Sequence, residues 1–232
     1  RAARTAVKDT TNLNEVMLAQ QQIIRGATNY LSQHMGTVQE YTEAVYQLGQ
    51  AEMKRSDILA LAPTVMSLAK GLDAPVEKVT HLLLGLNELY KDNLPGLENN
   101  VARIEKISGM IALAAKKEVA TVEQISTGLA YVGSLAKTAS VPLEDIIALT
   151  ARLNTNLVQG GKAGTGLRQM LNAIAKNADK LNQAFNLGID TTKPPALFDI
   201  LERLGTRLSS GQITTGALEN VMGGGNLRGA VP

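Results

Sequence analysis

The chain has 232 residues, of which 44% are hydrophobic and only 3% aromatic, and it contains no cysteine. Its core must therefore be built from aliphatic side chains, which suit helix-on-helix packing better than a β-sandwich or barrel. The net charge of +2 is close to balance, so the composition gives no support for direct nucleic-acid binding. The lack of cysteine excludes disulfides and thiolate metal sites.

The two ends of the chain and its apolar runs give no targeting signal. No run approaches the roughly 18 to 20 apolar residues that a membrane helix needs, and the longest, Leu82–Leu86, is interrupted by Gly85. The first ten residues have no apolar stretch, so no signal peptide is predicted. Because the chain begins with Arg1 and ends on Pro232, we expect a segment of a longer protein. Trimming of a tag or by a protease is the alternative.

Apolar residues recur every three or four positions from Leu13 to Leu48. This spacing predicts a long amphipathic helix, with a break near Gly36. A core helix and a self-associating coiled coil are equally good interpretations, because charge pairs at the flanking heptad positions are sparse.

The middle of the chain repeats itself at an offset of 67 residues. The same residue types recur in both copies: Ile58, Val65, Ser67, Leu68, Ala69, Lys70, Pro75, Glu77, Leu82, Leu86 and Asn87 match Ile125, Val132, Ser134, Leu135, Ala136, Lys137, Pro142, Glu144, Leu149, Leu153 and Asn154. Each copy is predicted to form a helix, a short break and a second helix.

The two breaks carry the same start signal for the helix that follows. Asp73 and Ser140 can accept hydrogen bonds from free backbone N–H groups. Pro75 and Pro142 fit the first turn, where no N–H is needed. We interpret the pair of copies as a duplicated helical hairpin.

The rest of the chain follows the same helical period. Helices are predicted at 101–115, 122–136, 143–157, 167–185, 197–208 and 216–222. The glycine-rich stretch 160–166 is predicted to be a loop, since so many glycines disfavour a helix. No segment alternates with period two, so the fold class is all-α: helical hairpins with one duplicated unit, preceded by a long amphipathic helix.

No constellation of residues predicts catalysis or cofactor binding. The stretch 160–166 fails as a phosphate loop, because Gly161-Lys162 is followed by Ala163 rather than Ser or Thr, and Asn156 stands where the first glycine belongs. His34 and His81 are the only histidines and lack nearby carboxylates at ligand spacing, so packing or surface roles are expected. We therefore predict no catalytic residue, no cofactor and no metal site.

An ordered set of motifs resembles the core region of phage tail tape measure proteins of the minor tail protein type. The motifs lie at 129–136, 140–146, 160–171, 185–190 and 197–204. Their order and spacing make the resemblance specific, and it covers residues 56–210. The resemblance therefore implies three regions: a polar segment and long helix at 1–55 with coiled-coil character, a core helical domain at 56–210, and a short helix with a glycine-rich tail at 211–232.

The resemblance marks a set of structural motif residues: Gly164, Thr165, Leu167, Arg168, Met170, Leu171 and Gly188. We expect Gly164 to end the loop with a positive φ and Thr165 to cap the following helix. Leu167 and Leu171 lie one turn apart and should be buried together. Arg168 should point to the other face, towards a neighbouring helix or subunit.

What the resemblance implies is a structural, non-enzymatic virion protein. Such a protein acts in tail assembly, tail length determination and genome ejection, and lies in the tail interior or at the tail tip. The implied partners are copies of itself, as a homotrimer first and a homohexamer second, together with tail tube and tail tip or baseplate hub proteins. The alternatives are a helical adaptor or coiled-coil scaffold, and a carrier of peptidase or muramidase activity, for which this chain supplies no residues.

Overall fold

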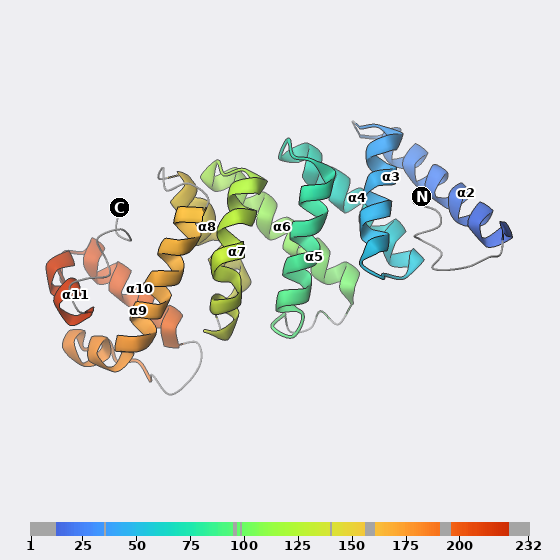
Figure 1. Ribbon diagram of the computed structural model, residues 1–232. Coiled ribbons are helices and arrows are strands. Elements are labelled where there is room, and N and C mark those ends of the chain that lie inside the picture. The colour runs from blue at the N-terminus through green and yellow to red at the C-terminus, as the bar shows by residue number, and fades with distance from the viewer. Residues whose placement is uncertain are drawn as a thin grey trace. The chain divides into compact units, whose positions relative to one another are not determined.

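The computed structural model describes residues 13–34, 36–94, 97, 99–139, 141–155, 161–190 and 196–222. These residues form ten helices and no strand (Figure 1), which confirms the all-α prediction. In chain order the helices are α2 (Leu13–Leu31), α3 (Val38–Gln50), α4 (Arg55–Gly71), α5 (Val76–Tyr90), α6 (Asn100–Glu118), α7 (Val122–Thr138), α8 (Leu143–Thr155), α9 (Gly161–Phe185), α10 (Ala196–Ser209) and α11 (Thr215–Met222). None of the described helices is both long and apolar enough to cross a membrane.

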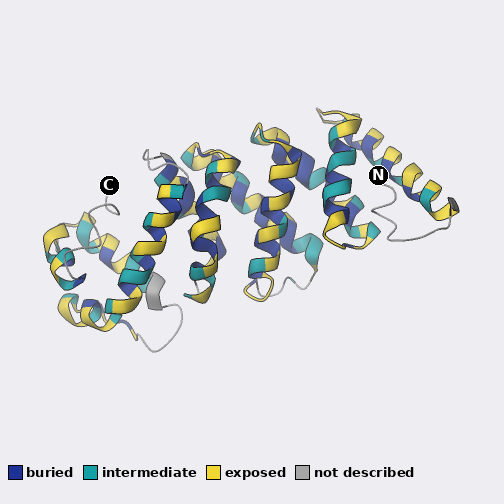
Figure 2. Cartoon of the chain, in the orientation of Figure 1, coloured by how far each residue is buried: buried dark blue, intermediate teal, exposed yellow. Residues whose placement is uncertain are grey.

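The chain divides into two compact units, Arg1–Glu123 and Gln124–Pro232. In each unit the helices are amphipathic, with a buried stripe and an exposed stripe (Figure 2). This pattern is the one that apolar residues at three- and four-residue spacing produce on a helix.

The first unit contains α2 to α6. Here α3 packs against α4 and α5, and α4 packs against α6. Two helical hairpins, α3–α4 and α5–α6, are therefore stacked side by side (Figure 1). The largest fully buried side chains of this unit are Tyr41, Leu48, Ile58, Leu61, Met66, Leu83, Tyr90, Ile104, Ile107 and Ile111.

The predicted break in the N-terminal helical stretch is confirmed. Helix α2 ends at Leu31 and α3 begins at Val38, with Gly36 between them. The start of α3 is a capping box: the Glu40 backbone N–H donates to Thr37 Oγ1 (3.1 Å), and the Thr37 N–H donates to Glu40 Oε2 (2.9 Å). Because both orphan donors are satisfied here, the new helix starts at a defined residue.

The duplicated unit seen in the sequence is present, and it is larger than the predicted hairpin. Helices α4 and α7 begin at Arg55 and Val122, which are 67 residues apart, and α5 and α8 begin at the same offset. A third helix belongs to each copy, since α6 and α9 end at Glu118 and Phe185, again 67 residues apart. The repeat is therefore a three-helix unit.

A left-handed residue closes the last helix of each repeat. Glu52 (φ 58°), Val119 (φ 51°) and Asn186 (φ 47°) follow α3, α6 and α9 at successive offsets of 67 residues. Left-handed residues are a common way to end a helix, and glycine or asparagine usually fills that position. The valine and the glutamate are therefore held there against their own preference.

The turn after the first helix of each copy also recurs. The N–H groups of Ala74 and Val141 donate to the carbonyl oxygens five residues earlier, each at 2.9 Å. Gln212 makes the same 2.9 Å bond after α10, so α10 and α11 begin a third, partial copy. These bonds are those of a Schellman turn.

One expectation for these breaks is wrong. Asp73 was expected to cap α5, but Pro75 is the N-cap residue and no side chain caps this helix. Asp73 adopts a left-handed conformation (φ 48°) in the turn that ends α4, so its backbone serves the preceding helix. Its counterpart Ser140 lies outside the described residues.

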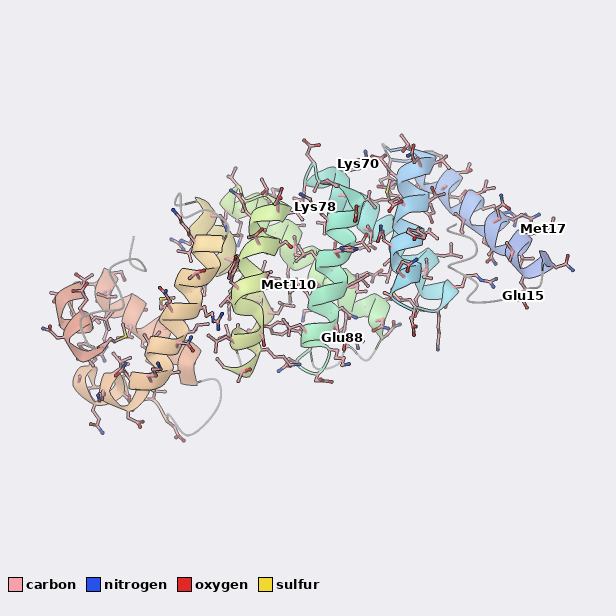
Figure 3. The ribbon with its side chains drawn as sticks, in the orientation of Figure 1. Glu15, Met17, Lys70, Lys78, Glu88 and Met110 are labelled. Carbon is pink, nitrogen blue, oxygen red and sulfur yellow. The ribbon has the colours of Figure 1, made fainter. Side chains whose placement is uncertain are left out.

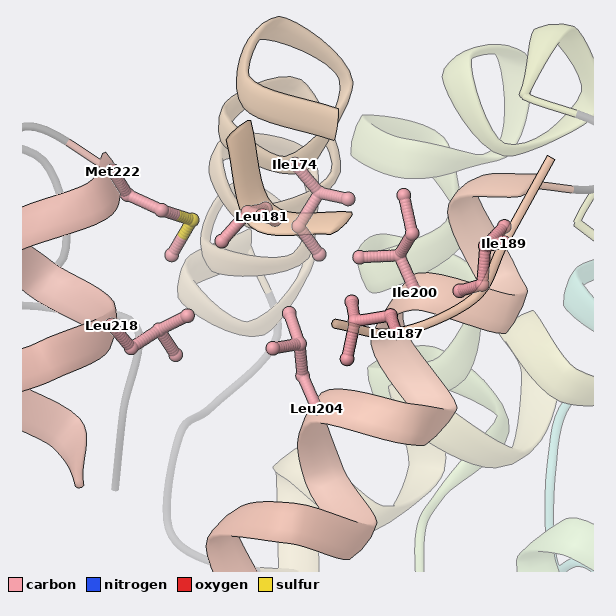
Figure 4. Close-up of a cluster of buried hydrophobic side chains, with 8 residues drawn as sticks. All are labelled: Ile174, Leu181, Leu187, Ile189, Ile200, Leu204, Leu218 and Met222. Atoms are coloured by element: carbon pink, nitrogen blue, oxygen red, sulfur yellow. The ribbon is translucent and has the colours of Figure 1, made fainter. Parts of the chain in front are cut away.

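The second unit is organised around α9, which packs against α8, α10 and α11. Figure 4 shows buried side chains from α9, α10, α11 and the loop after α9 meeting in one cluster. Its members are Ile174, Leu181, Leu187, Ile189, Ile200, Leu204, Leu218 and Met222. Helix α9 is kinked at Asn177 (φ −118°, ψ 15°), whose side-chain amide donates to the Ala173 carbonyl (2.9 Å).

The first unit should lose stability in alkaline solution. Burial raises the pKa of Tyr90 to about 12 and also raises the pKa of Tyr41 above its usual value. Because the folded state favours the protonated phenol, this stability is present below about pH 10 and is lost as pH rises towards about 12. We expect Tyr90→Phe to reduce the pH-dependent loss by on the order of 2 kcal/mol, measured by urea unfolding at each pH. Equal pH dependence in both proteins would contradict this.

Candidate functional site

The candidate site consists of the motif residues on α9 and the loop that follows it. Among the residues that the structure describes, no three His, Asp or Glu side chains are grouped so that they could hold a metal ion. The two histidines have ordinary contacts: the His34 ring stacks on Tyr30 with centroids 4.6 Å apart, and His81 Nε2 lies 3.2 Å from Gln47 Oε1.

The glycine-rich stretch is helical, so the prediction of a loop at 161–166 is wrong. Helix α9 begins at Gly161, and Gly164 is not among the residues with positive φ. Thr165 lies inside the helix and does not cap it. Gly160 is outside the described residues.

Close packing between α7 and α9 explains why glycine occupies this helix. A Cβ added at Gly164 would lie 2.3 Å from the Gly128 carbonyl oxygen and 2.9 Å from Cβ of Tyr131. A Cβ at Gly161 would lie 3.1 Å from the Tyr131 ring. The backbones of the two helices therefore touch at Gly128 and Gly164, and any side chain at Gly164 would push them apart.

Comparison of the two copies shows what this contact adds. The residue that corresponds to Gly128 in the first copy is Leu61, which is fully buried. Helix α6 begins at Asn100, the counterpart of Leu167, whereas α9 begins earlier, at Gly161. The motif glycines therefore make room for additional helical turns at the start of α9, packed against α7.

The next motif residues separate onto two faces of α9. Leu167 and Leu171 are each 1% exposed, and Met170 packs against the edge of the buried cluster. Thr165 and Arg168 are exposed. The motif thus combines an apolar face that fixes α9 in the unit with a polar face that is open for further contacts.

The last motif residue, Gly188, lies in the loop after α9 with φ +66°. Its neighbours Leu187 and Ile189 point into the buried cluster (Figure 4). The Asn182 side chain grips the loop from α9: its amide donates to the Ile189 carbonyl (2.7 Å), and its oxygen accepts from the Ile189 N–H (3.0 Å). The left-handed glycine allows the chain to place two successive apolar anchors around one turn.

Two arginines of α10 satisfy carbonyl groups at the end of α9. Arg203 donates to the Leu187 carbonyl (2.5 Å), and Arg207 donates to the carbonyls of Phe185 (2.5 Å) and Asn186 (3.2 Å). The last carbonyls of a helix lack intrahelical partners and carry the negative end of its dipole. The arginines therefore tie α10 to this helix end.

The first unit contains a buried polar network that sequence patterns did not reveal. Arg103 is only 9% exposed; its guanidinium donates to Asn87 Oδ1 (3.0 Å), to the Leu97 carbonyl (2.7 Å) and to Asn100 Oδ1. These bonds fasten the connection between α5 and α6. A single charged residue within a helix is normally read as exposed, so no local signal identifies it.

The electrostatics of the second unit do not resemble those of a catalytic centre. Partial burial raises the pKa of Asp145, and the Glu144 and Glu202 carboxylates raise it further. The described polar groups nearest the motif instead bind backbone carbonyls and amides of the chain itself. The arrangement can hold helices in register and present a surface.

The α7–α9 contact should respond oppositely to alanine at two neighbouring glycines. Gly164→Ala places a methyl group against the Gly128 carbonyl, and we expect destabilisation of about 1 to 3 kcal/mol. Gly166→Ala meets nothing within 4 Å and should stabilise by up to about 1 kcal/mol through helix propensity. Urea unfolding of both variants checks this. Equal effects of the same sign would rule out the close contact.

Comparison with known proteins bears on what this architecture is for. The chain matches the model of the family described as phage-related minor tail protein over residues 25–222. It is 25% identical over 165 residues to a probable tape measure protein of Escherichia phage P2, an alignment that covers 68% of this chain and 19% of that protein. The chain thus spans about a fifth of the length of this relative. No solved structure matches it.

The family match includes both three-helix repeats, the α7–α9 contact and the loop after α9, and it ends where α11 ends. The features that the structure shows to be architectural are thus inside the matched region. The chain therefore belongs to the phage-related minor tail protein family and is a structural component of the virion tail.

Proposed function

We propose that the chain is a non-enzymatic segment of a tape measure protein that acts in tail assembly, tail length determination and genome ejection. The observation that carries this proposal is the alignment with the probable tape measure protein of phage P2 over 68% of the chain. The helical repeat supports it, because each helical residue adds a fixed rise of about 1.5 Å. A protein that measures length needs such a fixed relation between residues and distance.

The way the helices fold back on one another refines this role. The longest described helix has 25 residues, and neighbouring helices pack side by side within each unit. The segment therefore adds far less length per residue than a straight helix would. We propose that it is a folded block within the tail interior or at the tail tip, attached to longer helical parts of the same protein.

A non-enzymatic role is supported by the use that the fold makes of its buried polar groups. Arg103 and Asn87 hold the α5–α6 connection, and the buried Asn154 donates to the Thr150 carbonyl within α8 (2.7 Å). These side chains bind groups of the protein itself. We accordingly propose no cofactor and no direct contact of this segment with nucleic acid.

The proposed partners are further copies of the chain, as a trimer first and a hexamer second, and tail tube and tip or baseplate hub proteins. An exposed apolar line on α2 supports self-association: Met17 and Ile24, which are 51% and 52% exposed, lie seven residues apart on one side of the helix. Figure 3 shows Glu15 and Met17 projecting from α2. The helix carries only Glu15 and Arg25 as charged residues, so two copies would meet with little like-charge repulsion.

Substitutions on this line should weaken self-association. We expect Met17→Gln with Ile24→Gln to lower the average mass measured by light scattering at high protein concentration. Leu113→Gln, at an equally exposed apolar side chain of α6 (55%), is the matched control and should leave the mass unchanged. A monomer in the unsubstituted protein, or an equal effect of the control, would count against autonomous assembly through α2.

The function itself can be tested by deleting residues 56–210 from the full-length protein and imaging the tails by electron microscopy. A straight helix of this many residues would be about 230 Å long. We expect failed assembly, or tails that are shorter by much less than this length, because the segment is folded. Gly164→Leu in the full-length protein is the control that disturbs the fold without removing residues. Normal tails of normal length after the deletion would refute the proposal.

A further inference from the structure

The joint between α6 and α7 breaks the helix at a place where the sequence provides no helix breaker. Residues 119–121 are Val, Ala and Thr, whereas Pro75, Pro142 and Gly188 interrupt the connections after α4, α7 and α9. The break depends on Val119, which has φ 51° and ψ 35° and is 84% exposed. A β-branched residue is especially unfavourable in this left-handed conformation.

The buried faces of α6 and α7 share one continuous heptad register through this joint. Positions that alternate by three and four residues run unbroken along both helices: Val101, Ile104, Ser108, Ile111, Ala115, Glu118, Val122, Ile125, Leu129, Val132 and Ala136. All of them are buried except Val101 and Glu118. Such a register over several heptads is typical of a single helix with one apolar stripe.

The joint also lies beside the division between the two compact units, which falls between Glu123 and Gln124. Helix α6 packs against α4 and α5 inside the first unit. Helix α7 packs against α9 inside the second unit, at Gly128 and Gly164. A change of backbone conformation confined to the joint therefore leaves the interior packing of each unit in place.

We propose that the α6–α7 joint is a conformational switch, in which Val119 moves from the left-handed to the right-handed helical region and the two helices join. The product is one helix from Asn100 to Thr138, about 58 Å long. Joining pairs the free carbonyls at the end of α6 with the free N–H groups at the start of α7. It also releases the strain at Val119.

What opposes the switch is the local structure around the joint. Ala120 and Val122 are 7% and 2% exposed, and Lys78 forms an ion pair with Glu123 (2.9 Å) within the first unit. This pair is well exposed to solvent, so it contributes little to stability. The opposing contributions are small and local, which allows the broken and continuous forms to coexist.

The equivalent joint of the preceding repeat marks the limit of the proposal. Glu52 occupies the same position after α3 and also has positive φ. That joint lies inside the first unit, where α3 and α4 pack against each other. Straightening it would separate two helices of one core, so we assign the switch to the α6–α7 joint alone. This inference does not depend on the proposed tape measure function.

The switch can be measured by pulsed electron spin resonance between two spin labels. The chain has no cysteine, so Glu105→Cys and Ser134→Cys, at exposed positions of α6 and α7, provide unique attachment sites. In a continuous helix these positions are about 44 Å apart, and the broken form gives a shorter distance. Val119→Ala favours the helix, whereas Val119→Gly favours the left-handed break.

We expect two populations in the unsubstituted protein. The ratio of the long to the short distance should be about tenfold or more higher in Val119→Ala than in Val119→Gly. Asp73→Gly is the matched control, because Asp73 is also left-handed but Pro75 prevents α4 and α5 from joining. A single short distance in all variants, or an equal shift in the control, would overturn the proposal.

Discussion

The backbone contact between Gly128 of α7 and Gly164 of α9 is the constraint on which the second unit depends. It fixes the start of α9, and α9 in turn carries the core against which α8, α10 and α11 pack. A chain with so few aromatic residues cannot fill wide gaps between helices, so its helices must approach closely. Glycine makes this approach possible at a cost in helix propensity of about 1 kcal/mol per residue, which the packing offsets.

Sequence periodicity was sufficient to predict the helices, because each has to bury one face. The 67-residue offset between matching residues such as Ile58 and Ile125 also predicted that two copies share their helix boundaries. Local reasoning failed at residues 161–166, since glycine propensity argues for a loop and only the partner helix reveals the helical state. It also missed the left-handed helix ends at Glu52 and Val119, where no glycine signals the turn.

The residues that matter for the candidate site are likewise divided. Leu167 and Leu171 could be assigned to the buried face from their spacing alone. Gly128, Arg203 and Arg207 could not, because each acts on a segment that is distant in sequence. The motif of this family is therefore a record of helix packing, and its residues identify a tail protein through architecture. Its polar face and exposed apolar line remain available for assembly.

The central claim is that the tail contains this segment as folded helical units held together by the α7–α9 contact. Cysteines at Tyr131 and Gly161, whose positions are in contact, can be joined by a short bifunctional maleimide in a chain that has no other cysteine. The account predicts that this cross-link forms in purified tails as readily as in the isolated segment. A cross-link that forms in the isolated segment but never in assembled tails would contradict it.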